Sequence, residues 1–269
     1  MHRKILVACL LFLSLPARAQ LEFESSGGTY FQYYLTQDNR FSELPPGYRF
    51  AFSIDNLVYR TSRGHFFVNA ANATVISRLD TAAIKLDKIR YRIDPGFRLV
   101  EPWYEANFLL SHECIHEIDR ARNGGSIFWN SLQVNFGTKG AYDHNLVDRV
   151  VHRDFQLRNS LDYKVGADAY LFGDAAYFIA QNHEYRAHTQ AMIRYNWAMW
   201  KKSAFYADIK QDAWLTAQAD WQTRGAVQLN WILLSRKSVG VLYTEYAYID
   251  QNPFDNENSL WSLGARILY

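Results

Sequence analysis

The chain has 269 residues and a net charge of +2, and its mean hydropathy is slightly negative although 49% of its residues are apolar. This charge balance predicts neither a nucleic-acid partner nor a strongly acidic one. Its two cysteines are too few for a disulfide framework, and its length fits a single domain.

Residues 1–19 are expected to be a cleaved signal peptide. A basic start is followed by an apolar run over residues 5–15, which is too short to span a bilayer. Ala17-Arg18-Ala19 then matches an A-x-A cleavage site. The mature chain would be residues 20–269 with Cys114 as its only cysteine, so no disulfide could form within it.

About twelve segments alternate apolar and polar residues with a period of two, which is typical of strands with one apolar and one polar face. The clearest is 183–200, where Ile193 and Tyr195 alternate with Arg194 and Asn196. The strands are expected, in chain order, at residues 29–38, 48–62, 65–79, 82–94, 103–119, 127–137, 155–172, 183–200, 203–220, 224–236, 239–250 and 260–269.

The last segment places Trp261, Leu263, Ile267 and Tyr269 on one face. A final strand that ends on an aromatic residue resembles the closing strand of bacterial outer-membrane β-barrels. The resemblance implies an all-β fold, a transmembrane antiparallel up-and-down barrel of about twelve strands. It also implies an outer-membrane location, a monomer, and contact of the C-terminal strand with the barrel-assembly machinery.

Both ends of such a barrel face the periplasm, and its longer loops lie outside. The polar segments 37–46, 119–127 and 251–258 are therefore expected outside, and short turns such as 235–238 in the periplasm. Residues 138–154 fit poorly as a long periplasmic connection, and a short helix or an extended strand there stays open. The histidines in that connection, His144 and His152, are expected to be ordinary surface residues.

Several charged residues fall on the face expected to line the barrel interior. They would either line a narrow pore or fill the interior with salt bridges, and they are Arg186, Arg194, Asp208, Lys210 and Asp212.

Candidate chemistry is concentrated in residues 108–119. In a strand, His112, Cys114 and His116 share a face, whereas Glu113 and Asp119 fall on the opposite, more polar face. The more polar face should be the interior, so the two histidines and the cysteine would point toward lipid. Imidazoles on a lipid face are costly and call for a functional reason.

His112-x-Cys114 resembles the His-x-Ser pair of outer-membrane lipid A 3-O-deacylases, small barrels with an active site on the outer wall. The string from His112 to Asp119 is also similar to a His-x-Ser-x-His-x-x-Asp string in uncharacterised outer-membrane proteins. The resemblance continues in a Gly/Asn-bearing loop (residues 122–125) and Asn130 on the next strand. It departs from the deacylases at Ile115, where they carry Asn, in the lack of a matching catalytic Glu, and in the larger barrel.

This resemblance implies hydrolysis of an ester in lipopolysaccharide, with outer-membrane lipids as the partners and no cofactor. Cys114 would be the nucleophile and His112 or His116 the base. Glu117 or Asp119 would orient the base, and Asn130 would help to hold an oxyanion. The catalytic set is thus predicted as His112, Cys114, His116, Asp119 and Asn130.

Two alternatives stay open. His112-Glu113-x-x-His116 matches the H-E-x-x-H zinc motif, which requires a helix; in a strand, His112, Cys114 and His116 could instead bind a metal together. The other alternative is a barrel without enzymatic activity, either a narrow channel or a structural protein. In that case the histidines are interfacial residues, and Cys114 is a small apolar side chain.

Overall fold

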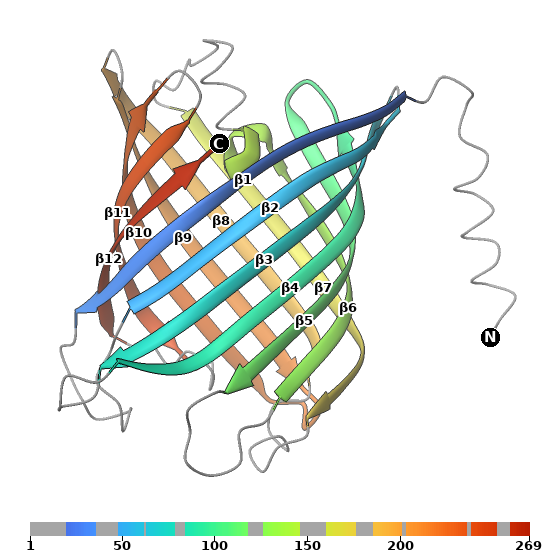
Figure 1. Cartoon of the computed structure of the whole chain (residues 1–269), viewed down its shortest axis with the longest axis vertical. Coiled ribbons are helices and arrows are strands. Elements are labelled where there is room, and N and C mark those ends of the chain that lie inside the picture. Colours follow the sequence, from blue (N-terminus) through green and yellow to red (C-terminus); the bar gives the residue numbers. More distant parts are fainter. Residues whose placement is uncertain are drawn as a thin grey trace, which may run out of the picture.

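The chain forms a closed antiparallel β-barrel in the computed structural model (Figure 1). The structure describes residues 20–35, 48–61, 63–78, 84–117, 126–145, 160–175, 185–200, 203–235, 238–251 and 259–269. Within these ranges there are twelve strands, namely β1 (Gln20–Leu35), β2 (Tyr48–Arg60), β3 (Gly64–Arg78), β4 (Ile84–Val100), β5 (Tyr104–Glu117), β6 (Ser126–Thr138), β7 (Ser160–Ala175), β8 (Tyr185–Trp200), β9 (Ser203–Thr216), β10 (Trp221–Leu234), β11 (Val239–Asp250) and β12 (Leu260–Leu268).

Each strand pairs with its neighbours in the sequence, and β1 pairs with β12 to close the sheet. The closing ladder runs from Gly28 opposite Leu268 to Leu35 opposite Trp261. Closure leaves no strand edge, so every strand can satisfy its backbone groups between two neighbours, as a lipid environment demands. The described residues contain no helix that is long and apolar enough to cross a membrane.

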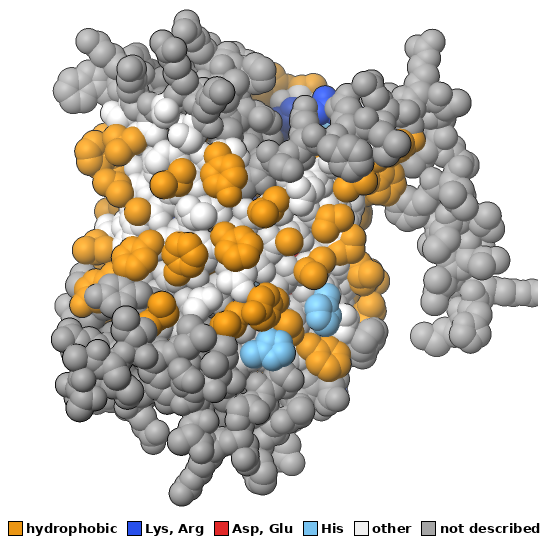
Figure 2. All heavy atoms as spheres, in the orientation of Figure 1, with side chains coloured by type: hydrophobic (Ala, Val, Ile, Leu, Met, Phe, Trp, Pro, Cys, Tyr) orange, Lys and Arg blue, Asp and Glu red, His pale blue; other side chains and the backbone are white. Residues whose placement is uncertain are grey.

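Alternate residues on each strand face opposite sides of the wall. On β6, Ser131 and Gln133 are buried in the interior, whereas Leu132 and Val134 are exposed on the outside. Figure 2 shows hydrophobic side chains spread over this outer wall. The predicted fold class, an antiparallel barrel with an apolar exterior and a polar interior, is therefore confirmed.

Strand existence is predicted correctly throughout, and the errors lie at strand ends. The strand predicted at 203–220 ends at Thr216, because a tight turn with Ala219 at φ 68° reverses the chain. The strand predicted at 82–94 continues to Val100 through Pro95, which lacks an N–H but still pairs opposite Val68. The predicted signal peptide at residues 1–19 lies outside the described residues.

The prediction that Arg186 lies in the interior is wrong, because the start of β8 is irregular. A register shift between Tyr185 and Ala187 in the ladder with β9 reverses the alternation there. Tyr185 consequently lies against interior residues, and Arg186 is exposed. Arg194, eight residues further along, is almost completely buried in the interior as predicted.

The connection after β6 folds back into the barrel. It begins with η1 (Lys139–Ala141), and residues 139–145 are called the plug segment below. Its carbonyl oxygen at Gly140 accepts a hydrogen bond from Arg194 Nη1 at 3.0 Å, and His144 Nε2 lies 3.0 Å from Glu105 Oε2. His144 is thus an interior contact of the barrel and not the ordinary surface residue that the sequence predicted, whereas His152 lies outside the described residues.

Asp143 anchors the plug segment between two strands that are distant in the sequence. Its carboxylate accepts from Arg266 Nη1 at 2.9 Å and from Arg194 Nη2 at 3.3 Å. Burial alone would raise the pKa of Asp143, but the two guanidinium groups outweigh it and hold that pKa well below its usual range. The carboxylate therefore stays ionised, and the plug segment stays tied to β8 and β12, at any physiological pH.

The pair of Arg194 with Asp208 is the most deeply buried ion pair of this network. Arg194 Nε lies 2.7 Å from Asp208 Oδ1, and their side chains are 2% and 1% exposed. We expect Asp208→Ala to lower the free energy of unfolding by about 3–5 kcal/mol, because it leaves a buried guanidinium without its main partner. Denaturant unfolding in lipid vesicles measures this; Asp220→Ala, at an exposed turn, is the control, and an equal effect of both would refute it.

Candidate functional site

Four of the five predicted catalytic residues lie on the outer face of β5 and β6, namely His112, Cys114, His116 and Asn130. His112 and His116 are exposed on the same face as Phe108 and Leu110, and Cys114 between them is half-buried. In the view of Figure 2, histidine side chains lie on the outer wall among hydrophobic ones. Two imidazoles thus lie on the surface that would meet lipid, near the C-terminal end of β5, at the barrel end opposite to the start of β1 and the end of β12.

A hydrogen bond joins the two strands at this position. His112 faces Asn130 across the ladder, and His112 Nδ1 lies 2.9 Å from Asn130 Oδ1. Because an amide oxygen only accepts, Nδ1 must carry the proton and donate it. Nε2 of His112 is then the basic nitrogen, so the contact fixes both the tautomer and the orientation of the ring.

Cys114 is the next residue along the same face. It is a free cysteine and stands opposite Phe128 on one side and Tyr91 on the other. Successive residues on one face of a strand are about 6.5–7 Å apart at Cα, and their side chains lean along the strand. Cys114 and His112 therefore occupy adjacent positions on the same outward face.

His116 has a different environment from His112. Its ring lies edge-on to that of Tyr91, with 5.8 Å between centroids. Of the two predicted bases, His112 is the one that a described hydrogen bond orients. The two histidines therefore differ in their described contacts, since His116 contacts an aromatic ring and His112 makes a hydrogen bond.

The two predicted orienting groups, Glu117 and Asp119, have no described side chain. Asp119 and residues 122–125 lie outside the described residues, as does the side chain of Glu117. Asn130 instead takes the place expected for an orienting group, since its amide oxygen holds His112. The oxyanion role predicted for Asn130 from the sequence stays a prediction.

The zinc interpretation of the same residues is wrong. The H-E-x-x-H segment is part of β5 and not of a helix, so Glu113 points to the opposite side of the wall from the two histidines. In the interior, Glu113 Oε1 lies 2.5 Å from Arg90 Nη2. Among the described residues, no group of three His, Cys, Asp or Glu side chains could hold a metal ion.

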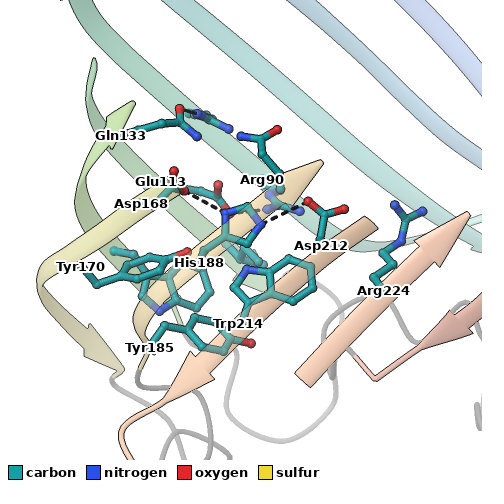
Figure 3. A pocket seen from close by; sticks show the side chains of 14 residues that line it. Arg90, Glu113, Gln133, Asp168, Tyr170, Tyr185, His188, Asp212, Trp214 and Arg224 are labelled. Carbon is teal, nitrogen blue, oxygen red and sulfur yellow. Dashed lines mark hydrogen bonds and ion pairs between the residues drawn. The ribbon is translucent and has the colours of Figure 1, made fainter. Parts of the chain in front are cut away.

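The sequence analysis missed a second candidate site inside the barrel. A cavity of about 230 Å³ lies in the half of the interior away from the plug segment, lined by residues of β4 to β10 (Figure 3). His188 lies there between Asp168 and Asp212, at 3.0 and 3.1 Å from their carboxylates. The sequence signal that could have revealed this site is the row of polar residues at alternate positions of β7, β8 and β9.

Comparison with known proteins identifies the fold. No protein family matches the sequence, and no curated protein is similar to it. Outer membrane phospholipase A from Escherichia coli is similar in structure, with a TM-score of 0.51 and 7% identity over 92% of this chain and 93% of that one. The outer membrane phospholipase of Salmonella typhi, a dimer with bound calcium, gives 0.51 and 7% over 93% and 92%.

A third similar structure is OmpT, an outer membrane protein of Vibrio cholerae, with a TM-score of 0.41 and 6% identity over 94% of this chain and 99% of that chain. At such low identities the likeness shows the fold alone. The chain has the fold of bacterial outer-membrane β-barrels. This fold agrees with the outer-membrane location predicted from the sequence.

The outward orientation of Cys114 is directly testable. We expect a nitroxide attached to Cys114 to collide more often with oxygen, which concentrates in lipid, than with a water-soluble nickel chelate. Ser131→Cys in a Cys114→Ala background places the label in the interior, because Ser131 is buried there. Electron paramagnetic resonance of protein in liposomes measures both accessibilities; a nickel-accessible label on Cys114 would contradict the placement.

Proposed function

We propose that this barrel is an acyl-ester hydrolase that acts on a membrane lipid from the outer face of its own wall. Cys114 is the nucleophile, His112 the base and Asn130 the group that orients the base. The observation that carries the proposal is the hydrogen bond from His112 Nδ1 to Asn130 Oδ1, beside a thiol on the apolar face.

The three residue types form a known catalytic combination. Cysteine, histidine and asparagine serve together in papain-like proteases, and such sets recur on unrelated folds with the same division of roles. A polar trio on a lipid-facing wall also needs an explanation beyond stability, because each polar group there is costly. Catalysis on a lipid substrate explains both the residue types and their location.

The reaction follows from the tautomer of His112. Nε2 takes the Sγ proton of Cys114 while the sulfur attacks the carbonyl carbon of a lipid ester. The imidazolium then gives this proton to the departing alkoxide, which leaves as an alcohol, and an acyl thioester remains on Cys114. A water molecule, deprotonated by Nε2, attacks the thioester, and the returned proton restores the thiol as the fatty acid departs.

The position of the site supports a substrate that lies in the bilayer. The exposed apolar residues Phe108 and Leu110 precede His112 on the same face, so acyl chains would lie along them while the ester lies at Cys114. Two similar structures are phospholipases by name, which is in keeping with a lipid ester. Lipid A stays the substrate predicted from the sequence, and a phospholipid is the alternative substrate.

We expect Cys114→Ala to abolish fatty-acid release and His112→Ala to lower it by about 100-fold to 10,000-fold, the usual contribution of a general base. Asn130→Ala should lower it by up to about 100-fold, because the ring loses its orientation. Mass spectrometry of lipid A and of phosphatidylethanolamine, each incubated with the purified barrel, measures the release.

Matched controls separate catalysis from folding. Ile209→Ala and Leu263→Ala remove exposed apolar residues from the outer face of β9 and β12, away from the site, and should leave the rate within a few-fold, as should His116→Ala. Release that persists undiminished in Cys114→Ala would refute the proposal. So would a complete lack of release from both lipids by the folded wild-type barrel.

The alternative of a narrow channel has a separate test. The plug segment lies in the half of the interior near the start of β1 and the end of β12, and the fully buried side chains there include Arg194, Tyr206 and Glu105. We expect low conductance from the wild-type barrel in planar bilayers and a several-fold rise in Asp143→Ala, which releases the plug segment. High conductance in the wild type would favour the channel.

A further inference from the structure

The interior cavity is separate from the outer-wall site. Its lining residues face inward from seven consecutive strands, β4 to β10, in the half of the barrel away from the plug segment. A second cavity of about 210 Å³ adjoins it and shares Arg90, Arg92, Glu113 and Ile115. These volumes are below the roughly 300–1,000 Å³ typical of drug-sized ligands, so an occupant would be small.

His188 organises the acidic side of this cavity. Its Nδ1 lies 3.0 Å from Asp168 Oδ2, and its Nε2 lies 3.1 Å from Asp212 Oδ1. Its ring stacks on Trp214 with 4.8 Å between centroids and 15° between planes. Both ring nitrogens are therefore used within the protein, and His188 holds two carboxylates in place without itself offering a group to a ligand.

One carboxylate oxygen beside the cavity lacks a partner. Asp168 is 9% exposed at its side chain, and its Oδ1 is buried with no hydrogen-bond partner among the described residues. A buried carboxylate oxygen without a donor is unfavourable. Because Asp168 lines the cavity, a ligand that donates a hydrogen bond would satisfy this oxygen.

The charged groups around Asp168 favour a neutral ligand that donates a hydrogen bond. Three arginines line the cavity, and each already has an acidic partner: Arg90 pairs with Glu113, Arg92 with Asp94, and Arg224 with Glu245. A cationic ligand would meet these guanidinium groups as well as the imidazole of His188. A hydroxyl group can donate to Asp168 without adding a charge to this balanced set.

Aromatic rings line another part of the cavity. Tyr185 contacts Trp129, Tyr170 and Trp214, with centroids 5.9, 5.6 and 6.3 Å apart. All four rings line the cavity, and Figure 3 shows Tyr170, Tyr185 and Trp214 near the charged groups. Their apolar faces suit a flat, weakly polar ring surface, and the adjoining carboxylates and amides suit hydroxyl groups on its rim.

We propose that the interior cavity binds a neutral sugar ring, which packs on the aromatic residues and donates a hydroxyl hydrogen bond to Asp168. A small ring with several hydroxyl groups meets each requirement: size, neutrality, an apolar face and a donor. The barrel would then carry a saccharide site inside its wall, independent of the ester-hydrolysing site outside it.

Binding is tested with D-glucose, D-galactose and N-acetyl-D-glucosamine, titrated separately into the full barrel. The detergent must be free of sugar headgroups, for example lauryldimethylamine oxide. We expect a saturable change in tryptophan fluorescence and saturation-transfer signals in NMR from at least one sugar. Asp168→Asn should weaken this binding by about tenfold or more, since hydrogen bonds to charged groups are among the stronger ones.

Control variants make every outcome decisive. Asp220→Asn, in an exposed turn, should bind as the wild type does, and so should Cys114→Ala, because its site lies on the other side of the wall. Tyr170→Leu, which spares the contacts of His188, should also weaken binding, and this variant provides the test if Asp168→Asn fails to fold. Absence of binding by all three sugars, undiminished binding in a folded Asp168→Asn barrel, or tighter binding of the diamine putrescine would overturn the proposal.

Discussion

Closure of the sheet is the constraint on which the structure depends. Backbone N–H and C=O groups have no partners in hydrocarbon, so a strand that faces lipid must pair on both sides. The ladder between β1 and β12 meets this condition by removing the two edges that an open sheet would have. The period-two alternation of side chains then decides what each residue meets, because every strand separates an apolar exterior from a polar interior.

Because of this alternation, three consecutive residues of one strand can face two environments, the lipid outside and the polar interior. On β5, His112 and Cys114 point to the outer face, while Glu113 between them forms an ion pair with Arg90 inside. The outer face can therefore carry chemistry that meets lipid, and the inner face a charged cavity. The interior network also helps to hold β5, the strand that carries Cys114, since Arg90 of β4 pairs with Glu113 of β5.

The sequence predicted what depends on local alternation. All twelve strands, the fold class and the outward face of His112 and Cys114 follow from the pattern of apolar and polar residues, and the structure agrees. The failures concern non-local or irregular features. A β-bulge reversed Tyr185 and Arg186, a tight turn shortened β9, and the H-E-x-x-H string matched a motif whose chemistry needs a helix.

Contacts between residues distant in the chain could not be predicted. The sequence named Asn130 as a candidate site residue, but its hydrogen bond to His112 depends on the exact ladder register, which a one-residue shift would destroy. The plug segment depends on Asp143 meeting Arg194 and Arg266 from two other strands. No periodicity within the connection reveals such partners.

The central claim is that His112, oriented by Asn130, activates Cys114 on the lipid-facing wall. The rate at which a long-chain alkyl chloromethyl ketone modifies Cys114 in liposomes tests it without knowledge of the substrate. The account predicts the fastest modification in the wild type, slower modification in Asn130→Ala, and a rate lower by about 100-fold in His112→Ala. Equal rates in all three proteins would contradict it.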